Sequence, residues 1–222
     1  MNPLGSVKRA FRRVTSGLAT YRLSSNATDG AVLAAFLAAC GDVARPRVLE
    51  LGTRRSDPTR PTRHDEWVPH ASEYVGTDID AGVDVDFVAD VHHLTDVTGR
   101  ERYDVIISCS TFEHFKYPHL AAHEIMRTLR VGGLLFVQTH QSFPEHGHPY
   151  DYFRYSREAL AGLFGARMGF RIDQTAYEYP ARIHSPHGRH LAYGPAFLNV
   201  CLFGHKAAST PDEYVYELDT EV

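Results

Sequence analysis

Short apolar segments alternate with helical segments along residues 28–206, and this alternation constrains the fold more than any other feature of the sequence. The apolar segments have the length and the β-branched content of buried strands. Strands that alternate with helices build a parallel sheet covered by helices. The sequence therefore predicts an α/β fold, Rossmann-like, with a seven-stranded, mostly parallel sheet and helices on both faces. The predicted strands are 48–52, 73–78, 86–90, 103–108 and 134–137, followed by two edge strands at 170–178 and 197–204.

Cap and turn residues predict where the helices and loops lie. A helix is expected over residues 28–40, and Pro118 suits the first turn of a later one. The Gly132–Gly133 pair is predicted to break that later helix. Ser156 has the side chain to cap a third helix. The polar, Pro-rich stretch 53–65 is predicted to be a loop, with a short helix around Trp67 after it.

Charge divides the chain into three predicted segments. Residues 1–27 are basic and carry no acidic residue, which is typical of an amphipathic helix. Such a helix packs its apolar face on the domain, covers an anionic substrate, or contacts a membrane surface. Residues 28–206 form the main domain, with an insertion rich in His and aromatic residues at 141–156. Residues 207–222 form an acidic tail.

Composition excludes several classes of protein. The formal net charge of −4 argues against a nucleic-acid partner. No apolar run approaches the roughly 18 residues that span a bilayer, so no integral membrane segment is expected. The three cysteines are far apart and form no CxxC pair, which favours buried, reduced thiols. We therefore expect a cytoplasmic protein.

Residues that follow the predicted strands mark the expected ligand site, because ligands bind beyond the carboxyl ends of parallel strands. Gly52 ends the first strand and lets the backbone approach a ligand. Asp78 ends the second strand, where a carboxylate can accept both hydroxyls of a ribose. Asp90 ends the third, and Ser108 the fourth. Each residue alone is a weak signal, but their order and spacing together indicate a nucleotide-type ligand.

Several segments resemble successive motifs of class I S-adenosylmethionine-dependent methyltransferases, in particular the broad "type 11-like" bacterial group. The run Tyr103–His114 resembles the fourth-strand motif that ends in Glu-His, and Glu124–Gly133 resembles the helix and Gly-Gly turn. His148–Tyr155 resembles a His-Pro-x-Asp-Tyr-aromatic-Arg insertion of one subset, often found near sugar or cell-envelope gene clusters. The resemblance covers roughly residues 45–170.

The resemblance implies S-adenosylmethionine as cofactor, and it assigns roles to individual residues. The methionine end would be lined by Glu50, Gly52 and Thr53. Asp78 would hold the ribose, and Ile79 would pack on adenine. The adenine edge would be read by Asp90 and Val91, while Ser108 would face the cofactor from the fourth strand.

One motif departs from the family pattern, which has Gly-x-Gly after the first strand. Here the run is Gly52-Thr53-Arg54-Arg55, so the second glycine is missing. We expect cofactor binding to be retained, with Arg54 or Arg55 pairing with the methionine carboxylate. A guanidinium group suits a carboxylate well.

Histidines are the candidate general bases, because a base on the acceptor promotes methyl transfer and histidine titrates in the right range. His114 and His140 follow the fourth and fifth strands and are the predicted catalytic residues. Residues of the insertion either bind the acceptor or hold the loop. They are His146, His148, Tyr150, Asp151, Arg154 and Tyr155.

A metal site is not predicted, because the histidine spacings match no metal-binding motif. A second group of histidines, His184, His187 and His190, lies in a later loop. A metal-assisted enzyme that uses the histidines of both groups stays an alternative.

The sequence thus predicts an S-adenosylmethionine-dependent methyltransferase that acts on a small-molecule or sugar acceptor, most simply by O-methylation with a histidine base. A homodimer is compatible with this prediction. The alternatives are a non-catalytic member that binds cofactor or a partner, and a nicotinamide-dependent oxidoreductase. The oxidoreductase would need a Gly-x-Gly-x-x-Gly turn that opens into a helix, which is missing here.

Overall fold

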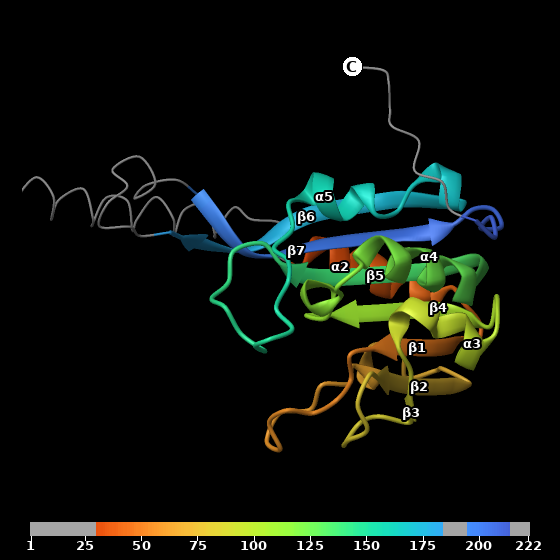
Figure 1. Cartoon of the computed structure of the whole chain (residues 1–222). Helices are drawn as coiled ribbons and strands as arrows, with labels where there is room; N and C mark the ends of the chain where they lie inside the picture. The colour runs from red at the N-terminus through yellow and green to blue at the C-terminus, as the bar shows by residue number, and fades with distance from the viewer. Residues whose placement is uncertain (1–29, 184–194, 214–222) are drawn as a thin grey trace, which may run out of the picture.

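The computed structural model describes residues 30–183 and 195–213, and in them a seven-stranded sheet with the strand order β3-β2-β1-β4-β5-β7-β6 (Figure 1). The predicted fold class is confirmed. Five strands are parallel to one another: β1 (Arg47–Leu51), β2 (Glu73–Asp78), β3 (Phe87–Val88), β4 (Tyr103–Cys109) and β5 (Leu129–His140). The chain order reverses between β1 and β4, so their carboxyl ends form the switch point of the sheet.

Two long strands close the sheet, β6 (Phe170–Arg182) and β7 (Pro195–Lys206). The structure corrects one detail of the prediction, because only β6 is an edge strand. β7 lies between β5 and β6 and is antiparallel to both. This pairing places Asn199 of β7 directly opposite His140, the last residue of β5.

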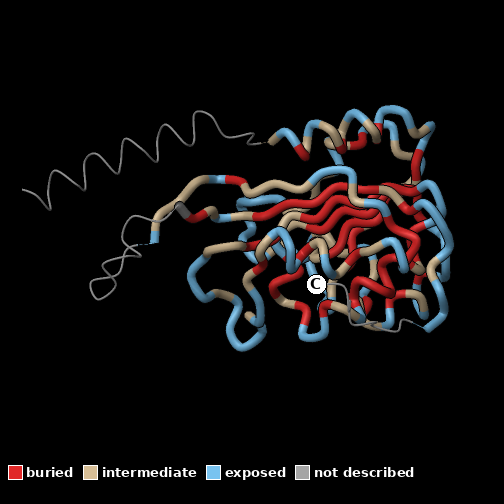
Figure 2. The backbone as a smooth tube through the Cα atoms, turned by 90° about the horizontal axis from the view of Figure 1, so that it is seen from above, coloured by how far each residue is buried: buried red, intermediate tan, exposed pale blue. Residues whose placement is uncertain are grey.

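Helices cover both faces of the sheet, as predicted. One face packs against α2 (Ala31–Gly41), whose Phe36 stacks on Phe136 of β5 with ring centroids 5.1 Å apart. The other face carries α3 (Leu94–Thr98), α4 (Pro118–Thr128) and α5 (Arg157–Gly162). The short 3-10 helices are η1 (Asp65–Trp67), η2 (Val91–His93), η3 (Phe112–His114) and η4 (Ala166–Met168). Burial is concentrated in the central strands (Figure 2).

The end of α4 differs from the prediction, because the helix stops at Thr128, before the two glycines. The carbonyl groups of its last residues, Arg127 and Thr128, accept hydrogen bonds from the chain that leads into β4. β5 begins at Leu129 and then bulges, so that Tyr103 pairs with Leu129 but Val105 pairs with Leu134. The Gly132–Gly133 pair lies in this bulge, where Gly132 adopts a positive φ of +83°.

The caps predicted from Pro118 and Ser156 are present. Pro118 is the first residue of α4. The Ser156 hydroxyl accepts a hydrogen bond from the Ala159 N–H at 3.1 Å and begins α5. The predicted third strand at 86–90 is reduced to Phe87–Val88, and the Asp86 carboxylate beside it accepts a hydrogen bond from the Gly76 N–H.

The predicted basic segment 1–27, His184, His187 and His190 lie outside the described residues, as does most of the acidic tail. β7 ends at Lys206, where the main domain was predicted to end. Among the residues that the structure describes, no helix has the length and apolar character needed to cross a membrane.

Candidate functional site

The predicted ligand residues meet at the carboxyl edge of the sheet. Leu51 at the end of β1 pairs with Thr77 of β2 and with Ser108 of β4. Gly52 and Asp78, each one residue further on, therefore lie at neighbouring strand ends. The loop after β1 and the insertion after β5 both leave the sheet at this edge (Figure 1). The edge is thus built from the strand ends that the sequence indicated.

Gly52 brings the end of β1 into direct contact with the turn after β4. Its φ is +77°, a conformation that favours glycine. A Cβ atom at this position would lie 2.2 Å from Oγ1 of Thr111. The Thr111 hydroxyl itself is held by the Cys109 carbonyl at 2.9 Å. Only a residue without a side chain fits between β1 and Thr111.

We expect Gly52→Ala to be more destabilising than Gly132→Ala, although both residues have positive φ. Gly132 has open space around its Cβ position, so its substitution costs only the backbone strain of about 1–2 kcal/mol. Gly52→Ala adds the clash with Thr111, on the order of 1–3 kcal/mol. Urea unfolding of the two variants measures the difference, and equal losses of stability would contradict this packing.

Acidic side chains follow β2 and β3. The carboxylate of Asp78 is half-buried and accepts the Arg54 N–H at 3.1 Å. Ile79, the next residue, is 64% exposed. The Asp90 carboxylate accepts the backbone N–H of His92 at 2.9 Å, and its side chain stays 45% exposed. Both carboxylates thus keep surface available for a ligand.

Two hydroxyl groups beside these acids are buried without a partner. Among the described residues, neither Oγ1 of Thr53 nor Oγ of Ser108 has a hydrogen-bond partner. Ser108 lies on β4 and Thr53 follows Gly52, so both hydroxyls belong to the edge formed by β1 and β4. An unpaired buried polar group is uncommon in a folded protein.

Glu50 lies just before this edge and holds the loop that follows β1. It is fully buried, and its carboxylate accepts the His64 N–H at 2.9 Å and the Tyr74 hydroxyl at 2.6 Å. The His64 ring lies 2.5 Å from the other oxygen. With both oxygens engaged, Glu50 positions the loop from within, and a direct contact with a ligand is not favoured.

The contact with Glu50 makes His64 sensitive to pH. Burial opposes its charge, but the hydrogen bond and the attraction of Glu50 outweigh burial and raise the pKa of His64. A raised pKa in the folded state stabilises the fold below the unfolded-state pKa, and this contribution is lost as the pH rises through the folded-state value.

We therefore expect His64→Gln to lose more stability at about pH 5.5 than at about pH 8.5, relative to the wild type. Urea unfolding at the two pH values measures this difference. The exposed His93, substituted in the same way, is the control and is expected to show no such trend. A His64→Gln deficit that is independent of pH would overturn the interpretation.

The two arginines after Gly52 differ in availability. Arg55 donates to both oxygens of Asp84, with its Nε 2.7 Å and its Nη2 3.0 Å away. The Arg54 guanidinium is half-exposed, and within residues 30–183 and 195–213 its ion pair is with Asp80, at 3.8 Å. Of the two guanidinium groups that the sequence offered for a carboxylate ligand, Arg54 is the one still available.

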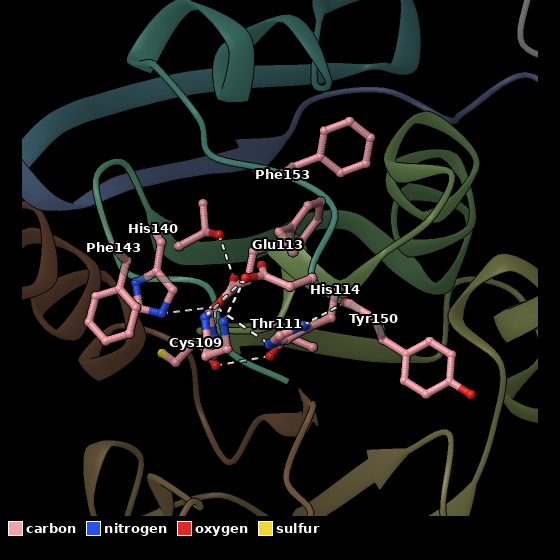
Figure 3. Close-up of polar contacts among 12 residues, drawn as sticks. Cys109, Thr111, Glu113, His114, His140, Phe143, Tyr150 and Phe153 are labelled. Atoms are coloured by element: carbon pink, nitrogen blue, oxygen red, sulfur yellow. Dashed lines mark hydrogen bonds and ion pairs between the residues drawn. The ribbon is translucent and has the colours of Figure 1, made fainter. Parts of the chain in front are cut away.

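Glu113 and three histidines form a cluster at the ends of β4 and β5 (Figure 3). Glu113 and His114 lie in η3, directly after β4. His140 ends β5, and His146 comes from the insertion. The Glu113 side chain is fully buried, and its Oε1 lies 3.1 Å from Nε2 of His140, 3.7 Å from Nε2 of His146 and 3.9 Å from Nε2 of His114.

The outer nitrogens of two of these rings face oxygen acceptors. Nδ1 of His114 lies 2.8 Å from the Tyr150 carbonyl, and Nδ1 of His140 lies 3.0 Å from Oδ1 of Asn199. A carbonyl oxygen only accepts, so Nδ1 of His114 carries the proton and Nε2 of its neutral ring has a lone pair. Both nitrogens of His140 face oxygen atoms, those of Asn199 and Glu113. Burial lowers the pKa of His140, against the opposing attraction of the Glu113 carboxylate.

The insertion is held by Arg154, whose donors are all directed inward. Its two Nη atoms donate to the Asp151 carboxylate at 2.6 and 2.7 Å. The same guanidinium donates to the backbone carbonyls of Phe143, Pro144 and Phe153. Arg154 and Asp151 therefore hold the loop in shape, which is the second of the two roles that the sequence left open.

The other residues predicted to bind the methyl acceptor differ in their exposure to solvent. Tyr155 is buried, and its hydroxyl donates to the Phe112 carbonyl at 3.1 Å, so it also supports the loop. Tyr150 and His148 are exposed. His146 lies in the cluster around Glu113, and its backbone N–H donates to Asp151.

Sequence reasoning missed Glu113 and Asn199 as site residues. Glu113 immediately precedes a predicted base and belongs to the Glu-His pair that ends the fourth-strand motif, and these were the signals available for it. Asn199 lies 59 residues from His140 in the sequence and meets it only through the β5–β7 pairing. No local pattern indicates that contact.

The seven-stranded sheet, the glycine turn after β1 and the acids after β2 and β3 define the class I methyltransferase fold that the resemblance implied. The chain belongs to the methyltransferase domain family, because the model of this family matches residues 23–175. The predicted enzyme class is therefore confirmed. No curated protein matches the chain.

Solved structures share this fold. The YcgJ protein from Bacillus subtilis is 14% identical, with a TM-score of 0.57 over 80% of this chain and 99% of that one. A methyltransferase from Mesorhizobium loti that depends on S-adenosylmethionine is also 14% identical (TM-score 0.55; 78% and 96% covered). A SAM-dependent methyltransferase from Archaeoglobus fulgidus has the same identity and a TM-score of 0.53 (86% and 94% covered). These likenesses show the fold alone.

Proposed function

We propose that the chain transfers the methyl group of S-adenosylmethionine to a hydroxyl oxygen of a small-molecule or sugar acceptor. The observation that carries this proposal is the contact between Gly52 and Thr111, which joins two halves of the edge. On one side lie the residues expected to bind the cofactor. On the other side, two residues beyond Thr111, begins the cluster of Glu113 and the histidines.

The side chains at the cofactor half of the edge suit the chemistry of S-adenosylmethionine. The Asp78 carboxylate would accept the ribose hydroxyls, and the exposed Ile79 would cover one face of the adenine. Asp90 would accept from the exocyclic amine, with the Val91 backbone beside it. The unpaired Ser108 and Thr53 hydroxyls offer donors that no other described group uses.

Arg54 would replace the contacts that the family makes with its second glycine. Between β1 and β2 the chain has only the short 3-10 helix η1 and no α-helix, and Glu50 holds the loop there. The half-exposed Arg54 guanidinium lies in this loop and suits the methionine carboxylate. When bound, the cofactor supplies an electrophilic methyl group.

His140 is the general base in this proposal, with His114 as the second candidate. Its Nδ1 faces Asn199 and its Nε2 faces the Glu113 carboxylate, which would stabilise the positive charge of a ring that takes a proton. His140 would take the proton from the acceptor hydroxyl as the oxygen forms its bond to the methyl carbon and the carbon–sulfur bond breaks. Orientation of the two reactants can supply roughly 7–11 kcal/mol of the barrier.

Exposed aromatic residues around the cluster suit an acceptor with an apolar ring face. Large side chains of the insertion remain exposed, namely Phe143, Tyr150, Tyr152 and Phe153. All four rings offer apolar area, and the two tyrosines add a polar hydroxyl, a combination that recurs at binding surfaces. Because Arg154 is engaged within the loop, this surface favours a neutral, hydroxylated acceptor over an anionic one.

Incubation with S-adenosylmethionine that carries a labelled methyl group tests the proposal. The acceptor panel contains monosaccharides, phenols, amines and carboxylic acids. We expect label in hydroxylated acceptors and expect the methyl group to be on oxygen. Transfer only to amines or carboxylates would overturn the acceptor class. Cofactor binding without transfer to any acceptor would favour the non-catalytic alternative.

A further inference from the structure

Hydrogen-bond acceptors face one another in the cluster around Glu113. Nε2 of His114 and Nε2 of His146 both point toward Oε1 of Glu113, at 3.9 and 3.7 Å. The three atoms lie within 4.8 Å of one another. Within the described residues, this buried Oε1 accepts no hydrogen bond. A buried carboxylate oxygen without a partner is costly, so the arrangement needs a positive charge at its centre.

The other polar atoms of these three side chains make hydrogen bonds of the kind that orient metal ligands. His114 donates its Nδ1 proton to the Tyr150 carbonyl at 2.8 Å, and Nδ1 of His146 faces the Pro144 carbonyl at 3.2 Å. The second oxygen of Glu113 accepts the Thr139 hydroxyl at 2.7 Å. Such outer contacts fix the tautomer of a ligating imidazole and the direction of a ligating carboxylate.

We propose that Glu113, His114 and His146 bind one divalent transition-metal ion of the zinc class. Two imidazoles and one carboxylate are a ligand set that suits such ions. Bonds of about 2.0–2.2 Å in a tetrahedral site place neighbouring ligand atoms about 3.3–3.5 Å apart. The separations of 3.7 and 3.9 Å from Oε1 of Glu113 need to contract by a few tenths of an ångström, and the two imidazoles, whose ligand atoms lie within 4.8 Å, would move together with them. Three protein ligands leave a position open, as in catalytic sites.

The ion would lie beside His140, whose Nε2 is 3.1 Å from the same Glu113 oxygen. This part of the inference rests on the proposed function. An acceptor hydroxyl at the open position would have its pKa lowered by the ion. His140 would then receive the proton. The sequence did not predict this site because the ligands come from the turn after β4 and from an insertion 32 residues later.

Calorimetric titration of the full chain with ZnCl2, after treatment with a chelator and dialysis, tests the site. We expect one ion per chain that is lost, or bound at least tenfold more weakly, in His114→Ala and in His146→Ala. His146 is partly exposed on a loop, so its substitution is compatible with folding. His148→Ala is the matched control, because His148 is exposed in the same loop, and we expect it to bind like the wild type.

Binding that survives both His114→Ala and His146→Ala would place the ion elsewhere and overturn the proposal, as would the lack of any binding to the wild type. Co²⁺ in place of Zn²⁺ gives a second readout, since visible d–d bands should disappear in the same two variants.

Titration of the metal-free protein with S-adenosylhomocysteine separates the two proposals. If the protein binds S-adenosylhomocysteine but no metal, the proposed metal site is wrong and the methyltransferase proposal stands. If it binds metal but not S-adenosylhomocysteine, the methyltransferase proposal is wrong and the metal site stands.

Discussion

The variant His140→Gln is expected to transfer the methyl group about 10²–10⁴ times more slowly than the wild type, which is the usual contribution of a positioned general base. Glutamine retains a polar side chain of similar length but cannot take a proton from an acceptor hydroxyl. The His140 ring stacks on Phe143 with centroids 4.0 Å apart and faces Asn199. These contacts fix the ring, with its Nε2 3.1 Å from Oε1 of Glu113, whose carboxylate would stabilise a proton taken by the ring.

The measurement is the rate of label transfer at saturating cofactor, with cofactor affinity measured in parallel. We expect the affinity to be unchanged, because His140 lies on the acceptor side of Thr111. His205→Gln, at the opposite end of β7 from Asn199, should retain the wild-type rate. A His140→Gln variant with the full rate would show that another group is the base, and His114 would be the first to examine.

The second large effect is expected for Asp78→Ala, which should weaken binding of S-adenosylmethionine by about 100-fold or more. A carboxylate that accepts two ribose hydroxyls makes two hydrogen bonds to a charged group, each contributing about 1.5–3 kcal/mol. Alanine accepts neither. Asp78 also accepts the Arg54 N–H at 3.1 Å, so its loss loosens the loop that carries Arg54.

Asp80→Ala provides the matched control for this prediction. Asp80 is an exposed acid two residues away, and its contact with Arg54 is a long ion pair of 3.8 Å. Exposed pairs of this kind contribute little to stability. Calorimetry should therefore show near-normal affinity for Asp80→Ala and a strong loss for Asp78→Ala. Equal affinities in the two variants would remove Asp78 from the cofactor site.

The sheet was predictable because strand and helix patterns are local properties of the sequence. The strands from Arg47 to His140, the Pro118 start and the Ser156 cap all follow from neighbouring residues. The position of β7 was not predictable, because strand order depends on packing between distant segments. The end of α4 at Thr128 was also missed, since it depends on hydrogen bonds from Glu101 and Arg102.

The candidate site was predictable where its residues end strands, as Gly52, Asp78 and His140 do. It was less predictable where a side chain had more than one possible hydrogen-bonding partner. The sequence offered Arg54 and Arg55 equally, and only the Asp84 contact distinguishes them. Arg154 likewise had two possible roles until Asp151 was seen to occupy its guanidinium. Such choices depend on three-dimensional proximity, which spacing in the sequence does not encode.

Titration of the wild-type chain with S-adenosylmethionine and with S-adenosylhomocysteine is the most direct test of the central claim. The edge formed by Gly52, Asp78 and Asp90 predicts that both ligands bind at one site per chain, with micromolar affinity. If neither ligand binds, this edge is not a cofactor site and the methyltransferase proposal is contradicted.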